Sequence, residues 1–157
     1  MANNNPQVGD IAPDFTLPDQ NGNPVQLKDQ LGKGALVLYF YPKDDSMGCT
    51  IEACTFRDSY TAFTDAGVQV IGVSKDSVES HQKFIKRHRL PFTLLSDEAG
   101  TVTKLYGAEM AFGLIRGRIT FLIDKGGVIR HRISDVVNMP RHANEMLNLI
   151  REMELSR

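Results

Sequence analysis

The segment that limits the possible folds of this chain most is an unbroken apolar run at residues 35–41, which ends at Pro42. A run of this kind, in contrast to an alternating one, is typical of a strand covered on both faces in the middle of a sheet. It is far shorter than the roughly 18 apolar residues that span a bilayer, so we expect no transmembrane segment. A strand buried on both faces needs layers above and below it, so this run predicts the middle strand of a covered sheet.

Strand and helix patterns alternate along the rest of the chain. Asn21-Gly22 is typical of a hairpin turn, Asp76 with Glu79 resembles a capping box, and Asp97 is placed to cap a short helix. The order of elements contains a thioredoxin-like core and predicts an α/β fold with an N-terminal β-hairpin, a mixed central sheet and helices on both faces. The predicted strands are 15–17, 25–27, 35–41, 68–74, 92–95, 119–124 and 128–133, and the predicted helices are 49–65, 76–88, 97–106 and one along Ala143, Met146 or Leu147, Ile150 and Met153.

Length and charge restrict the class of protein. A chain of 157 residues is expected to form a single domain over residues 1–157. Its 18 basic and 19 acidic residues give a net charge of −1, so we expect neither nucleic acid nor a membrane as partner. Residues 1–7 form a polar leader, expected to be flexible, without the features of a targeting peptide. The expected location is cytoplasmic, or an organelle stroma if the chain is a trimmed mature form.

Cys49 and Cys54 are the candidate reactive groups. Cys49 follows the apolar strand and Pro42, and it falls in the first turn of a predicted helix that Ser46 is positioned to cap. Unpaired backbone N–H groups at a helix start stabilise a thiolate. We therefore expect Cys49 to be a reactive thiol with a lowered pKa, in preference to a buried apolar residue.

The spacing leaves the role of Cys54 open. In a regular helix its Cα atom would lie about 8.5 Å from that of Cys49, beyond the roughly 7 Å limit for a disulfide. Either the helix unwinds locally or Cys54 is a core residue beside Ala53. Two cysteines without a nearby histidine do not supply the four ligands of a zinc site, and His81 and His88 are expected to be flank or surface residues. Glycine motifs for nucleotides are absent, so we predict neither a metal nor a cofactor.

The spacing of Pro42, Ser46 and Cys49 matches the Pro-x-x-x-[Thr/Ser]-x-x-Cys signature of the peroxiredoxins. Residues 48–58, Gly-Cys-Thr-Ile-Glu-Ala-Cys-Thr-Phe-Arg-Asp, resemble the bacterioferritin comigratory protein or peroxiredoxin Q branch of that family. The similarity continues at residues 9–15 and 118–124. Ser46 stands where Thr is commoner and Met47 where Pro is frequent, and these departures bear on rate and substrate preference, not on the reaction class.

The resemblance implies a thiol-dependent peroxidase that reduces hydrogen peroxide and alkyl hydroperoxides. Cys49 would be the peroxidatic cysteine, which becomes a sulfenic acid, and Cys54 the resolving cysteine, which closes an intramolecular disulfide for thioredoxin or a similar dithiol to reduce. Arg118 would stabilise the thiolate and hold the peroxide, Ser46 would hydrogen-bond the peroxide, and Pro42 would shield the site. A monomer is implied, because no third cysteine is present for a bond between subunits.

Other interpretations stay open at this point. A one-cysteine peroxidase would leave Cys54 with a structural role. A thioredoxin-like disulfide oxidoreductase would have Cys-x-x-Cys, whereas four residues separate the two cysteines here. A non-enzymatic redox sensor could use the same fold, while a copper-delivery module would need a third soft or imidazole ligand.

Overall fold

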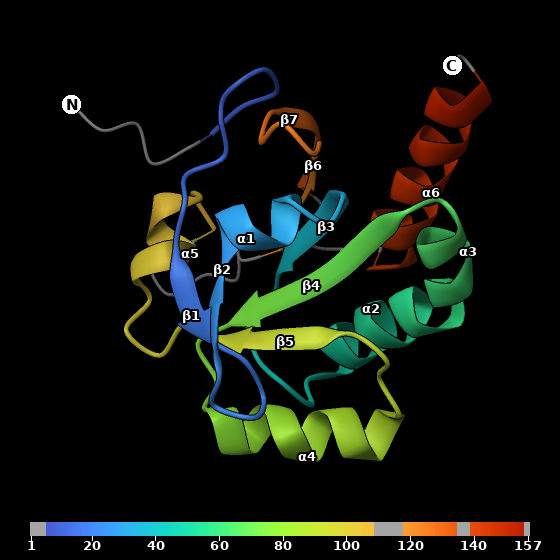
Figure 1. Ribbon diagram of the computed structural model, residues 1–157. Helices are drawn as coiled ribbons and strands as arrows, with labels where there is room; N and C mark the ends of the chain where they lie inside the picture. Colours follow the sequence, from blue (N-terminus) through green and yellow to red (C-terminus); the bar gives the residue numbers. More distant parts are fainter. Residues whose placement is uncertain (1–5, 109–117, 135–138, 156–157) are drawn as a thin grey trace.

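The computed structural model describes residues 6–108, 118–134 and 139–155 (Figure 1). The strands are β1 (Thr16–Pro18), β2 (Pro24–Gln26), β3 (Ala35–Phe40), β4 (Val68–Ser74), β5 (Thr93–Ser96), β6 (Ile119–Ile123) and β7 (Ile129–Ser134). The helices are α1 (Leu27–Leu31), α2 (Met47–Asp58), α3 (Tyr60–Asp65), α4 (Val78–His88), α5 (Thr101–Leu105) and α6 (Met139–Leu155). These elements confirm the predicted α/β class.

The central sheet has five strands in the order β5-β4-β3-β6-β7. β3 runs parallel to β4 and antiparallel to β6, so the sheet is mixed, as predicted. β1 and β2 form a separate antiparallel hairpin. The apolar run therefore occupies the middle of the sheet, which is the position that its uninterrupted hydrophobicity indicates.

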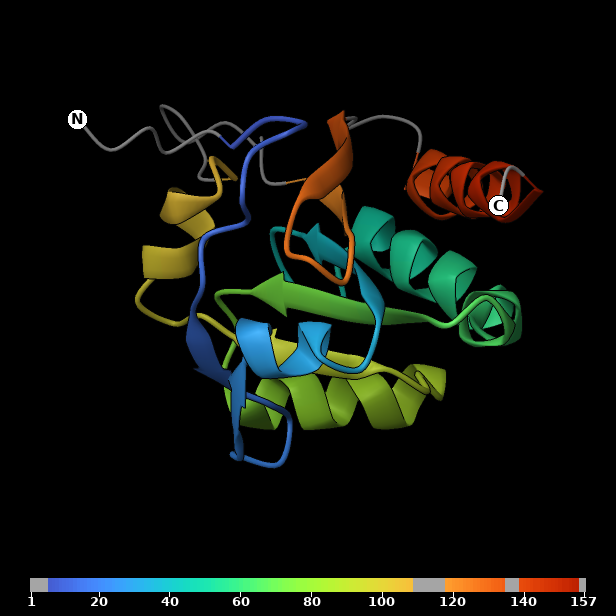
Figure 2. The ribbon, with the colours of Figure 1, turned by 45° about the horizontal axis from the view of Figure 1, so that its top comes forward.

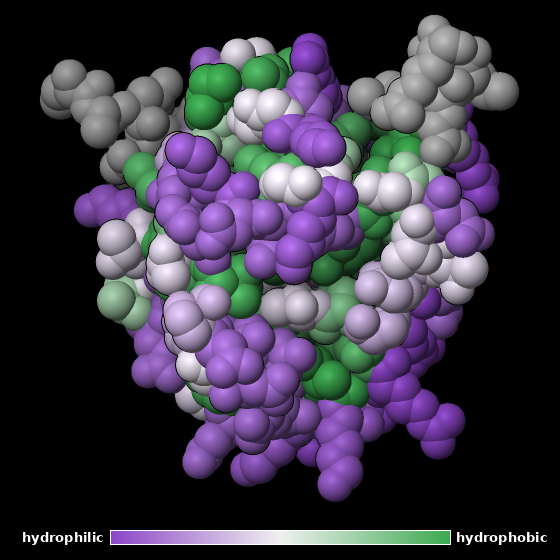
Figure 3. Space-filling view, viewed as in Figure 1, coloured by the Kyte–Doolittle hydropathy of each residue, from purple (hydrophilic) through white to green (hydrophobic). Residues whose placement is uncertain are grey.

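Helices cover both faces of the sheet, and the side chains of β3 point alternately to one face and the other. Val37 and Tyr39 pack into a cluster with apolar residues of α2, α3, α4 and α6. Leu36 and Leu38 pack into the other cluster, with residues of α1 and α5. Figure 2 shows α6 beside α2 and α3 at one side of the molecule, away from α1 and α5. The outer surface in Figure 3 is mostly hydrophilic, with smaller hydrophobic areas in the hollows.

Several local details differ from the sequence-based expectations. The predicted helix 49–65 is divided into two helices, α2 and α3. The break is at Ser59, whose backbone angles, φ −100° and ψ 3°, are not helical. The segment after β2 forms the short helix α1, which was not predicted. The predicted capping box at Asp76 is wrong: Ser77 caps α4, while the Asp76 carboxylate accepts bonds from the Asp44 amide and the Ser74 hydroxyl. The Asp76 carboxylate therefore binds groups outside α4, whereas the local sequence pattern had predicted that it binds the first turn of that helix.

The remaining expectations concern the helices α5 and α6, the N-terminal leader and a membrane span. The predicted helix 97–106 is shorter, because α5 begins at Thr101 with Gly100 as its N-cap, so Asp97 is not the cap residue itself. Its carboxylate still accepts bonds from the Val102 and Thr103 amides of the first turn. The apolar stripe of α6 is confirmed by the buried residues Ala143, Met146, Leu147 and Ile150, and the side chain of Met153 lies outside the described residues. Of the expected leader, the structure describes Pro6 and Gln7. Across the described part of the chain, every helix is too short or too polar to cross a bilayer.

Candidate active site

Cys49 lies in the first turn of α2, at the end of the loop that leaves β3. The Ser46 side-chain oxygen caps the helix by accepting a hydrogen bond from the Cys49 amide at 3.3 Å. The Ser46 hydroxyl in turn donates to the Lys43 carbonyl at 3.1 Å. Pro42 is half-buried directly after the strand, where its missing N–H ends the ladder. Residues 42–46, called the active-site loop below, therefore carry two of the predicted site residues, Pro42 and Ser46, and lead into the helical turn that holds Cys49.

Burial raises the pKa of the Cys49 thiol, whose residue is only 1% exposed. Hydrogen bonding with the Ser46 side chain and the Lys43 backbone, together with the positive charge of Arg118, acts in the opposite direction. The expectation of a lowered pKa is therefore wrong for this conformation. It considered the helix start alone and left out the desolvation of the thiolate.

Arg118 directly precedes β6 and reaches the same site from the neighbouring strand. Antiparallel pairing of Phe40 with Ile119 puts the start of β6 beside the end of β3, where the active-site loop begins. Arg118 is buried, and its charge lowers the pKa of Cys49. The structure thus brings Arg118, predicted only from the resemblance, into electrostatic contact with the thiol.

Glu52 is a buried carboxyl group that the sequence reasoning missed. It lies one turn after Cys49 in α2 and is fully buried. Its Oε1 is 3.5 Å from Arg118 Nη1, and its Oε2 is 3.4 Å from His142 Nδ1. Burial raises the pKa of Glu52 to about 8, against the opposing effect of Arg118. At neutral pH the group is therefore mainly protonated, which leaves the Arg118 charge available to the sulfur.

His142 and Thr120 complete this buried cluster from α6 and β6. The His142 Nδ1 atom is 2.6 Å from the Thr120 hydroxyl oxygen, and both residues are fully buried. A signal for these residues was present in the sequence, because Glu52 is four residues before the apolar Phe56 and His142 is four residues before the apolar Met146, a spacing that puts each pair on one helix face. A charged or polar residue on such a face is rarely buried without a partner.

Cys54 is half-buried, and both cysteines are free thiols. The two residues belong to the same uninterrupted helix, α2. The two sulfurs are thus not bonded in this conformation. A disulfide between them would require α2 to unwind locally, because the helix holds the two Cα atoms too far apart.

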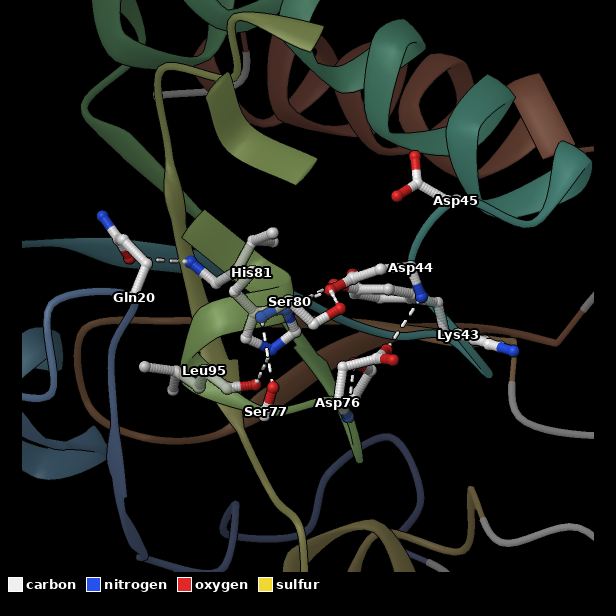
Figure 4. Close-up of polar contacts among 12 residues, drawn as sticks. Gln20, Lys43, Asp44, Asp45, Asp76, Ser77, Ser80, His81 and Leu95 are labelled. Carbon is white, nitrogen blue, oxygen red and sulfur yellow. Dashed lines mark hydrogen bonds and ion pairs between the residues drawn. The ribbon is translucent and has the colours of Figure 1, made fainter. Parts of the chain in front are cut away.

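The active-site loop is tied to α4 by a second buried cluster (Figure 4). The Asp44 carboxylate contacts His81 Nδ1 at 2.7 Å, and His81 is fully buried, so the expectation of a flank or surface histidine is wrong. Asp44, Asp76 and His81 offer ligand atoms within 4.8 Å of one another, the spacing of a possible metal site. Each of these side chains already has hydrogen-bond partners within the protein. We interpret the cluster as a support of the loop.

Comparison with known proteins identifies the family. The sequence matches the AhpC/TSA family over residues 8–132, which include the active-site loop, α2 and Arg118. The chain belongs to the AhpC/TSA family. This confirms the predicted resemblance to peroxiredoxins, and with it a thiol-dependent peroxidase, an enzyme.

Relatives within the AhpC/TSA family are similar over most of the chain. The chloroplastic peroxiredoxin Q of Sedum lineare is 46% identical over 147 residues, covering 93% of this chain and 78% of that protein. Peroxidoxin BcpB from Mycobacterium tuberculosis has a TM-score of 0.87 and 37% identity, covering 94% of this chain and 97% of that one. Peroxiredoxin Q of Xanthomonas campestris has a TM-score of 0.78 and 30% identity, covering 88% and 90%. These matches confirm the thioredoxin-like peroxiredoxin fold and the peroxiredoxin Q branch.

Proposed function

We propose that Cys49 reduces hydrogen peroxide and alkyl hydroperoxides, and that Cys54 resolves the oxidised product as an intramolecular disulfide. The observation that carries this proposal is the convergence of Ser46, the Lys43 backbone and Arg118 on the Cys49 sulfur, where all three favour the thiolate. No cofactor enters the scheme, because the sulfur itself carries both electrons. A related Xanthomonas campestris bacterioferritin comigratory protein is described as reducing alkyl peroxides, which supports the substrate class.

In the first step the Cys49 thiolate attacks one peroxide oxygen and the O–O bond breaks. The sulfur is oxidised to a sulfenic acid, and the other oxygen leaves as water or alcohol after it takes up a proton. Arg118 and the groups at the helix start stabilise the charge that moves onto the leaving oxygen. The Ser46 hydroxyl turns its hydrogen from the Lys43 carbonyl to the peroxide, and Pro42 excludes water from the loop.

In the second step the Cys54 thiol attacks the sulfenic sulfur, a disulfide forms and water leaves. Two Cα atoms five residues apart in a helix are about 8.5 Å from each other, so α2 must open between Cys49 and Cys54. Such an opening also moves Cys49 from its buried position to a place where a dithiol partner can reach the bond. A thioredoxin-type dithiol then reduces the disulfide by exchange.

The mass of the protein after one equivalent of peroxide tests the scheme. We expect a loss of about 2 Da, equal to two hydrogens, in the wild type and a gain of one oxygen in Cys54→Ser. Cys49→Ser is expected to show neither change and no peroxidase activity. A wild-type protein that gains oxygen and turns over with thioredoxin as fast as Cys54→Ser would instead support the one-cysteine alternative. Wild-type peroxide consumption by Cys49→Ser would contradict the peroxidase assignment to this sulfur.

Assembly and location stay proposals. We propose a monomer whose partners are the hydroperoxide and the dithiol protein, without nucleic acid or membrane. Light scattering on the reduced and oxidised protein tests the assembly. For location we propose the cytoplasm or an organelle stroma; the plant relatives are described as chloroplastic, which supports the second alternative.

A further inference from the structure

The active-site loop presents a buried carboxylate to α4. Asp44 is 4% exposed, and its two oxygens lie close to three polar groups of other residues. The Tyr41 hydroxyl donates to Oδ1 at 2.5 Å, the Ser80 hydroxyl donates to Oδ2 at 2.8 Å, and His81 Nδ1 lies 2.7 Å from Oδ2. A carboxylate that accepts three hydrogen bonds away from water is held in one orientation.

His81 has oxygen partners at both ring nitrogens. Nδ1 faces the Asp44 carboxylate, and Nε2 is 2.9 Å from the Leu95 carbonyl of β5. One hydrogen shared between Asp44 and Nδ1 and one donated by Nε2 to the Leu95 carbonyl satisfy both contacts, so the ring is fixed from two sides. Removing one member of this buried pair leaves a polar atom of the other without its hydrogen-bond partner away from water, which is costly.

The backbone of Asp44 is held as firmly as its side chain. Its amide donates to Asp76 Oδ2 at 2.8 Å, and that oxygen also accepts from the Ser74 hydroxyl at 2.6 Å. Figure 4 shows Asp44 between Ser80 and His81 of α4 on one side and Asp76 on the other. The next residue, Asp45, has a φ of 61°, in the left-handed region, and its carboxylate pairs with Arg87 of α4 at 2.8 Å. α4 and the end of β4 therefore determine where the loop lies.

The same loop carries the groups that act on Cys49. The Lys43 carbonyl, one residue before Asp44, accepts the hydrogen of the Ser46 hydroxyl, and the Ser46 oxygen binds the Cys49 amide. A displacement at Asp44 thus changes the position of both hydrogen-bonding groups that favour the Cys49 thiolate. We propose that Asp44 and His81 are positioning residues for attack by Cys49, because their buried pair fixes the active-site loop. This inference rests on the proposed role of Cys49.

Asp44→Asn and His81→Gln test the inference with two measurements, the second-order rate of peroxide reduction and the pH dependence of Cys49 alkylation. Displacement of a reacting group by about 1 Å can lower a rate roughly 100-fold, so we expect a 10- to 100-fold loss in each variant and a higher pKa of Cys49. The double variant is expected to lose no more than the worse single variant, since both changes remove the same pair.

Asp97→Asn is the matched control. Asp97 is also a buried carboxylate in a hydrogen-bond network, but its partners Val102 and Thr103 belong to α5. We expect this variant to lose stability and to keep the rate and the alkylation profile of the wild type. If Asp44→Asn does not fold, His81→Gln and Ser80→Ala, which removes one of the three donors, decide the question with the same measurements.

The outcomes distinguish failure of the positioning role of Asp44 and His81 from failure of the proposed function of Cys49. Unchanged rate and alkylation profiles in Asp44→Asn and His81→Gln would overturn the positioning role, while loss of activity in Cys49→Ser would leave the proposed function intact. Equal slowing in Asp97→Asn would also overturn it, because the effect would then follow from stability alone. Full activity in Cys49→Ser would overturn the proposed function and the positioning role together.

Discussion

Replacing Glu52 by glutamine is expected to change how the stability of this protein depends on pH. Glu52 is fully buried beside Arg118 and His142, and burial raises its pKa from an ordinary value of 4.5 to about 8. The folded protein therefore retains a proton that the unfolded chain loses over this range. Glutamine keeps the shape of the protonated side chain and cannot ionise.

The magnitude follows from proton linkage. Because the folded state binds more protons than the unfolded state between pH 4.5 and about 8, the free energy of unfolding falls as the pH rises through this window. Each unit of pKa difference corresponds to about 1.36 kcal/mol, so the whole window corresponds to about 5 kcal/mol. Below pH 4.5 both states are protonated, and above about pH 8 both are ionised, so the contribution is constant at either end.

Urea denaturation of the reduced protein at several pH values from 4.5 to 9 measures this effect. We expect Glu52→Gln to gain stability relative to the wild type as the pH rises, and the gain to level off above about pH 8. Glu145→Gln is the control: hydrogen bonding with His131 and Arg141 lowers the pKa of Glu145, so its stabilisation is lost only as the pH falls below 4.5. A stability difference for Glu52→Gln that stays flat across the window would refute the reasoning.

Three further substitutions test the surroundings of the site and the core. Ser46→Ala removes the cap of α2 and should lower the free energy of unfolding by about 1 kcal/mol, and it should raise the pKa of Cys49, which the pH dependence of alkylation measures. Arg118→Gln removes a charge that lowers the same pKa, so alkylation and peroxide reduction should both be slower at pH 7, and an unchanged alkylation profile would contradict the contact. In Gly72→Ala the added Cβ would meet the Tyr39 ring at 2.7 Å, and denaturation should show a loss of about 1–3 kcal/mol.

The sequence was sufficient for features that depend on neighbours along the chain. The apolar run predicted the middle strand β3, and Ser46 and Cys49 lie at the start of α2 because a capping residue and its first turn are within four residues of each other. The break between α2 and α3 at Ser59 could not be predicted from neighbouring residues in this way. The apolar spacing continues across it, and the local backbone angles are decided by packing of two separate helices.

The sequence by itself was sufficient for the layered α/β fold and the family, and it predicted Cys49 as the reactive sulfur. Only the tertiary structure decided the electrostatics of the site. Cys49 has a raised pKa, Glu52 meets His142, and Asp44 meets His81 across residues that are distant along the chain. Desolvation depends on every group packed around a charge, and no pattern of neighbouring residues contains that information.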